Sequence, residues 1–195
     1  MILRNVQIEA RFIDELLDLT RIERGKMEFI REPTDAHDAM RRALEVSTPD
    51  IKAKKQKLTV ALDAAHHEVG GDFLRLQQVF WNLLKNASKF TPERGEICVR
   101  SRNNSDEPGK IIINISDTGM GIAAESLPKI FEPFVQADES VTREFGGLGL
   151  GLALAKATVN GHGGTLRAES SGRGQGATFI VELPLLTLQA PSIVE

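Results

Sequence analysis

Several features that would assign this 195-residue chain to other protein classes are scarce or absent. It has one cysteine, Cys98, which excludes an internal disulfide and fits a reducing compartment. Cys98 lies in a strand-like run, and we expect it to be a small core residue rather than a reactive thiol. No apolar run approaches the ~20 residues that span a bilayer, and the N-terminus does not have the form of a signal peptide. We therefore expect a soluble domain.

The charge balance excludes a further class. The formal net charge is −3, and the hydrophobic and charged shares of 41% and 26% are those of a globular domain. Without an excess of positive charge, no nucleic-acid partner is expected. The sequence has neither an internal repeat nor a low-complexity tract, and its length suits one ordinary domain with an appendage.

The pattern of apolar residues predicts a long helix followed by a mixed α+β domain. Residues 2–24 form an amphipathic helix whose apolar stripe is broad enough to need a partner helix, in a bundle or a dimer. Further helices are expected over residues 36–46, from Asp72 through the 75–92 stretch, over 123–129 and over 149–160. Pro49 is expected to end or re-cap the first of these, with residues 50–55 continuing in helical or turn form. Strands are expected over residues 57–62, 67–69, 95–102, 110–117, 164–169 and 177–183, and residues 135–147 suggest a lid. Strands grouped in antiparallel pairs with helices between them favour an α+β sandwich.

The most unusual segment is the helix over residues 75–92. It is apolar on one side and carries Asn82, Asn86 and Lys89 at positions i, i+4 and i+7, so the three polar groups share a face. Two carboxamides and a cation in a line suit a metal ion and phosphate oxygens better than they suit a core.

Two glycine motifs follow this helix. Asp117–Ile122 reads D-x-G-x-G-I at the end of a strand, where the carboxylate can accept a hydrogen bond from an amine such as that of adenine. Taken alone, an ordinary Asp-Gly turn explains this motif as well. Gly147–Gly151 leads into a helix and exposes N–H groups that suit an anion. The second motif is not a P-loop, because no Gly-Lys-Ser/Thr follows.

Taken together and in this order, the motifs resemble those of the hybrid-type sensor histidine kinases with a Bergerat-type ATP-binding fold. The resemblance covers the N box (82–92), the first glycine box (117–122), the F box (131–134), the second glycine box (147–151) and a closing glycine run (172–179). It implies a two-layer α/β sandwich with a mixed, mostly antiparallel sheet and helices on one face. It also implies three parts: residues 1–27, similar to the second helix of the dimerisation and phosphoacceptor hairpin; the catalytic domain, 28–185; and a tail or linker, 186–195.

The resemblance further implies Mg-ATP as the ligand and gives each motif residue a role. Asn86 would ligate Mg²⁺ with Asn82 beside it, and Asp117 would bind the adenine amine. Phosphate contacts are implied for Lys89, Lys129, Arg143, Gly147, Leu148, Gly149, Leu150 and Gly151. On the base and lid side, the implied residues are Gly119, Gly121, Ile122, Phe131, Phe134 and Thr178.

One of these positions bears on the type of reaction. Relatives of this fold that hydrolyse ATP carry a glutamate one turn before the metal-binding asparagine, whereas this chain has Asn82 there. An amide cannot deprotonate a water molecule near neutral pH, so phosphoryl transfer to an external nucleophile is favoured over hydrolysis.

The family's phosphoacceptor motif is a histidine on the first dimerisation helix, followed by Glu or Asp and then by an Arg/Lys-Thr/Ser-Pro-like stretch, and this motif is absent from the sequence. His37-Asp38 is the nearest candidate, but it falls on the expected first helix of the ATP-binding domain. We therefore expect the chain to begin inside a kinase core and not to phosphorylate itself alone. Expected partners are a phosphoacceptor histidine domain, upstream in cis or supplied in trans, a response-regulator receiver domain, and a second copy in a full-length homodimer.

The expected compartment is the cytoplasm, either as a free protein or as the cytoplasmic part of a membrane-bound sensor. Two alternatives to a histidine kinase stay open at this stage. One is a non-catalytic ATP-binding and dimerisation module that regulates a partner kinase, and the other is a serine kinase of the anti-sigma type.

Overall fold

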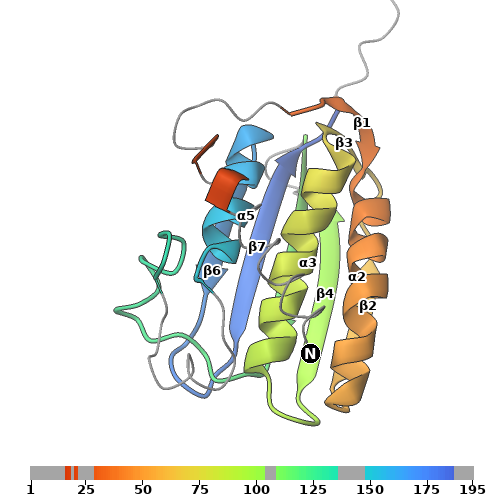
Figure 1. Ribbon diagram of the computed structural model, residues 1–195. Coiled ribbons are helices and arrows are strands. Elements are labelled where there is room, and N and C mark those ends of the chain that lie inside the picture. The colour runs from red at the N-terminus through yellow and green to blue at the C-terminus, as the bar shows by residue number, and fades with distance from the viewer. Residues whose placement is uncertain (1–15, 19, 22–28, 104–108, 136–147, 187–195) are drawn as a thin grey trace, which may run out of the picture.

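The computed structural model describes residues 16–18, 20–21, 29–103, 109–135 and 148–186, and it shows a two-layer α/β sandwich (Figure 1). One layer is a five-stranded sheet, and the three helices of the described domain cover one of its faces. The helices are α2 (Ala36–Ala53), α3 (Phe73–Phe90) and α5 (Gly151–Gly161). The strands are β1 (Glu32–Asp35), β2 (Lys57–Leu62), β3 (Glu68–Gly71), β4 (Glu96–Asn103), β5 (Lys110–Asp117), β6 (Thr165–Glu169) and β7 (Ala177–Pro184). The predicted fold class is confirmed.

The large sheet has the strand order β2-β4-β5-β7-β6 and is mixed. β2 and β4 run parallel, and the other three neighbouring pairs are antiparallel. The parallel pair departs from the expected grouping into antiparallel pairs, because α3 returns the chain across the sheet between β2 and β4. β1 and β3 form a separate two-stranded sheet.

The core lies between the sheet and the helices. In β5, Ile111, Ile113 and Ile115 are fully buried on the helix side, opposite α3 residues such as Phe80. Each such side chain contributes about 1.5–3 kcal/mol of transfer free energy. Cys98 is only partly buried, which corrects the expectation of a core residue. Side chains alternate along a strand, so Ile97 and Val99 take the helix face and Cys98 the other.

The structure decides one helix prediction and corrects another. Of the outcomes left open at Pro49, the helix continues: α2 runs through Pro49 to Ala53, and Ile51 in its last turn is 1% exposed. Burial of Ile51 stabilises the helix and so offsets the loss of the main-chain hydrogen bond that Pro49 cannot donate. The expected helix over 123–129 is instead a series of turns, with Lys129 N–H donating to Ser126 O at 2.9 Å.

The N-terminal helix can be followed only in part. Residues 16–18 and 20–21 are helical, and the rest of the predicted 2–24 helix lies outside the described residues. The Arg75 guanidinium donates to both carboxylate oxygens of Asp18, at 2.5 and 3.1 Å, which joins this segment to the start of α3.

None of the helices in the described ranges combines the length and the apolar character needed to cross a membrane.

Candidate functional site

The polar face predicted for α3 is present. Asp72 caps the helix, and its Oδ1 accepts a hydrogen bond from Arg75 N–H at 3.2 Å. Asn82 is 5% exposed, while Asn86 and Lys89 are partly buried. Burial lowers the pKa of the Lys89 ammonium. A partly desolvated cation beside two amides is a suitable environment for an anion.

The start of α5 meets this face. Asn82 Nδ2 donates to Gly151 O at 3.4 Å, and a Cβ on Gly151 would stand 3.6 Å from Asn82 Cγ. Leu150 occupies the N-cap of α5 without a side-chain hydrogen bond to the helix. Helix N–H groups without a side-chain cap can bind phosphate oxygens.

The C-terminus of α3 is held by two residues whose role the sequence did not reveal. Lys54 Nζ donates to the carbonyls of Ser88, Lys89 and Thr91 at 2.7, 3.0 and 3.1 Å. Gln56 Nε2 donates to Ser88 O at 3.0 Å and Thr91 O at 2.7 Å, and Ser88 Oγ donates to Gln56 Oε1 at 2.9 Å. These bonds satisfy carbonyls that a helix end leaves unpaired and so fix the backbone of Lys89.

Asp117 lies at the end of β5, where the chain turns back against α3. Burial raises the pKa of its carboxyl. The main-chain N–H groups of Gly119 and Ala177 lower that pKa, but by less than burial raises it. Gly119 N–H donates to Asp117 Oδ1 at 2.8 Å. A Cβ on Gly119 would lie 2.5 Å from Phe90 O, so only glycine fits this close approach.

Another glycine-rich loop, residues 170–176 near the C-terminal end of the domain, packs against the Asp117–Ile122 turn. Gly174 N–H donates to Met120 O at 2.6 Å, and Gly176 N–H donates to Gly119 O at 3.1 Å. Gly176 has φ +68°, and a Cβ there would lie 2.0 Å from Asp117 O. The two loops therefore interlock.

The segment over residues 131–135 contacts β7 and α5, and its end lies close to Gly149 of the 147–151 glycine motif. The Phe131 ring packs edge-to-face on Phe179 of β7 at 6.4 Å, with Lys156 Nζ of α5 4.8 Å from its centroid. Further along, Gly149 has φ +73°, and a Cβ there would lie 2.9 Å from Val135 O. Residues on either side of the predicted lid therefore lie in contact with each other.

The structure does not bring every predicted site residue into this arrangement. Thr178 lies on the opposite face of the sheet from Asp117, where its hydroxyl donates to Ser116 Oγ at 2.9 Å, and Ala177 is the residue paired with Asp117. Leu150 is 1% exposed and packs with Leu154 rather than facing the site.

Other predicted residues are exposed or cannot be placed. Phe134 is 59% exposed with φ +64°, and Lys129 is exposed. Arg143 and Gly147 lie outside the described residues, as does most of the predicted lid.

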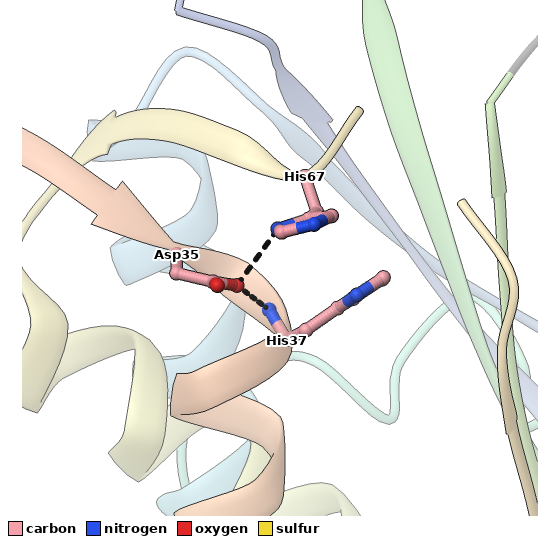
Figure 2. A group of neighbouring side chains, drawn as sticks. All are labelled: Asp35, His37 and His67. Atoms are coloured by element: carbon pink, nitrogen blue, oxygen red, sulfur yellow. Dashed lines mark hydrogen bonds and ion pairs between the residues drawn. The ribbon is translucent and has the colours of Figure 1, made fainter. Parts of the chain in front are cut away.

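A second polar cluster, Asp35, His37 and His67, lies where α2 begins (Figure 2). Asp35 Oδ1 accepts hydrogen bonds from His37 N–H and His67 Nδ1, at 2.8 and 2.9 Å. The two imidazoles are stacked, with centroids 4.3 Å apart and planes 20° apart. Ring-nitrogen lone pairs lie in the ring plane, so two stacked rings do not point at one ion. This cluster caps and fastens α2 rather than forming a metal centre.

Comparison with known proteins identifies the family. The sequence profile of the histidine kinase-, DNA gyrase B- and HSP90-like ATPases matches residues 71–187. This segment is more than half of the chain and contains every motif of the site. The chain therefore belongs to this family of ATP-binding domains, as the sequence predicted.

Individual proteins support the same conclusion. The autoinducer 2 sensor kinase/phosphatase LuxQ of Vibrio parahaemolyticus is 37% identical over 180 residues, which are 89% of this chain and 20% of that protein. The chain thus spans about a fifth of the length of this curated relative. Full-length ShkA in complex with AMPPNP matches with a TM-score of 0.77 and 30% identity, over 92% of this chain and 36% of that one. The mycobacterial sensor histidine kinase MprB matches with a TM-score of 0.68 and 29% identity, over 80% and 98% of the two chains.

Proposed function

We propose that this chain is the ATP-binding catalytic core of a hybrid-type two-component sensor histidine kinase. It binds Mg-ATP and transfers the γ-phosphoryl group to a histidine on a separate segment. Asn82, 5% exposed and hydrogen-bonded to the start of α5, carries this proposal. Its amide cannot serve as a general base toward water, so the site favours a positioned nucleophile over hydrolysis.

The chemistry of the described residues fits Mg-ATP. Asp117 and the interlocked glycine loops would hold the adenine, because the carboxylate can accept from its amine and glycines allow close approach. Lys89 and Lys129 would contact phosphates, and the amide oxygen of Asn86 would hold Mg²⁺. Bound Mg²⁺ would neutralise charge on the phosphates.

The chain's own residues act by positioning and by electrostatics. Lys54 and Gln56 fix the end of α3 and hence the backbone of Lys89. Asn82 keeps the N-terminus of α5 beside the same face. Preorganised donors of this kind stabilise phosphoryl transfer without reorganising during the reaction.

The burial of His37 supports an acceptor on another segment. His37 is 2% exposed, and its Nε2 is hydrogen-bonded to Ser101 Oγ at 2.8 Å. Asp117 pairs with Ile97 in β4, four residues before Ser101, so the two sites are about 13 Å apart along the strand. His37 is thus buried and lies far from the base end of the proposed site.

The proposed partners follow from this acceptor. We place the phosphoacceptor histidine on the first helix of a dimerisation hairpin, either upstream in cis or supplied in trans. The full-length protein is then a cytoplasmic or membrane-attached homodimer, and a response-regulator receiver domain accepts the phosphoryl group.

Incubation with γ-labelled ATP tests the proposal. We expect no label on the chain alone, and acid-labile, base-stable label on an added dimerisation domain that carries an acceptor histidine. The same domain with its histidine changed to glutamine is the control. Nucleotide binding without transfer would support a regulatory module instead, and acid-stable label on serine would support an anti-sigma-type kinase.

A further inference from the structure

Ser170, immediately after β6, lies half-buried between the two glycine loops of the site. Its Oγ accepts a hydrogen bond from Ile122 N–H at 3.0 Å and donates to Gly176 O at 2.7 Å. A third contact, from Gly172 N–H, is 3.3 Å long. One hydroxyl group thus bonds to the end of the Asp117–Ile122 turn and to the loop of residues 170–176.

The loops approach too closely for a side chain at Gly121. Gly121 has φ +67°, and a Cβ there would lie 2.0 Å from Gly172 O. Main-chain bonds from Gly174 and Gly176 join the middle of the turn. At the far end of the turn, the Ile122 N–H donates to the Ser170 hydroxyl instead.

The two ends of the turn are therefore fixed by different groups. At the start, Asp117 Oδ1 accepts from Gly119 N–H at 2.8 Å. At the far end, Ser170 Oγ accepts from Ile122 N–H. Without that hydroxyl, the turn would have more conformations available before the ligand binds, and binding would have to select one of them.

We propose that Ser170 is a positioning residue for the adenine base, acting through the turn that carries Asp117. This inference rests on the proposed function, because it assumes that Asp117 binds the base. Ser170 does not touch the nucleotide in this proposal. It holds the turn in the conformation that binds adenine, and its effect is therefore specific to the base.

Ser170→Ala tests the proposal in the isolated 195-residue chain. We expect about a tenfold weaker affinity for ATP, ADP and adenosine alike, since one hydrogen-bonding group is lost and the phosphates are not involved. Affinity for GTP, whose base has an oxo group at C6 in place of the adenine amine, should change by less than twofold. Ser171→Ala is the matched control, because Ser171 is the adjacent serine and is exposed.

The outcomes separate positioning from simple stabilisation. A lower melting temperature with ATP affinity within twofold of the wild type would overturn the proposal, as would equal losses for ATP and GTP. If Ser170→Ala does not fold, Ser170→Cys replaces it, since its thiol is a weaker hydrogen-bonding group, and an intermediate affinity for ATP is expected. Failure of the wild-type chain to bind ATP would instead refute the proposed function.

Discussion

The base side and the phosphate side of the site are built differently. On the base side, Asp117 and its turn are held by the loop of residues 170–176 through main-chain bonds and through the Ser170 hydroxyl. On the proposed phosphate side, the described bonds between motifs are fewer, and one of them runs from Asn82 Nδ2 to Gly151 O at 3.4 Å. Under the proposed assignment, the base side is thus held by more bonds among the described residues than the phosphate side.

The largest effect should come from breaking the base side at Gly176. Gly176→Ala forces a Cβ against Asp117 O at a positive φ, and it should lower the free energy of unfolding by roughly 3–5 kcal/mol. ATP binding should be lost. Gly174→Ala is the control, because Gly174 also has a positive φ but no atom within 4 Å of an added Cβ. Gly174→Ala should lower the free energy of unfolding, measured by thermal or urea denaturation, by only about 1–2 kcal/mol. Equal costs for the two variants would contradict the interlocked loops.

Asp117→Asn should remove base recognition and leave the fold intact. The amide keeps one acceptor oxygen in place of two and loses the negative charge, so affinity for ATP and adenosine should fall about 10- to 150-fold in calorimetry. Because burial disfavours the charged form, the melting temperature should stay the same or rise. Wild-type affinity for adenosine in this variant would show that Asp117 does not bind the base.

Lys89→Met should affect only the phosphate side. We expect ATP affinity to fall about tenfold, the loss of one partly desolvated ion pair, with adenosine affinity unchanged. Lys52→Met, at an exposed position of α2, is the control and should change neither. A loss of adenosine affinity in Lys89→Met would mean that the two sides are not independent.

The smallest effect should be a difference in how pH changes the affinities for adenosine and for ATP. The pKa of Asp117 is raised, so acidification protonates it at a higher pH than an ordinary aspartate, and adenosine affinity falls on the acid side. The pKa of Lys89 is lowered, so alkalisation removes its charge at a lower pH than usual, and ATP affinity falls on the basic side. Fluorescence titrations of both ligands across pH measure this. In Asp117→Asn, the acid decline for adenosine should disappear, and a decline of unchanged size would contradict the assignment.

Patterns with a strict period predicted much of this architecture. The spacing of Asn82, Asn86 and Lys89 placed them on one face of a helix, and the strand limits were right within a residue or two. Thr178, whose role only the resemblance implied, shows what the motif could not decide. In a strand, a shift of one residue changes the face of the sheet, and only the pairing of Asp117 with Ala177 shows which residue faces the site.

Residues that act through long-range contacts left no signal in the sequence. Lys54 and Gln56 cap α3 from more than thirty positions away, and Ser170 bonds to Ile122 across 48 positions. No local pattern distinguishes Ser170 from the exposed Ser171 next to it. Local propensity also left the end of α2 open at Pro49, where burial of Ile51 extends the helix to Ala53.

The contact between Val135 and Gly149 sets how freely the sequence between them can vary. A segment whose ends already touch is a closed loop, and the entropy of closing it grows only with the logarithm of its length. Doubling the number of residues between these positions would cost only about 0.6 kcal/mol. Insertions between these two residues should therefore cost little free energy of unfolding.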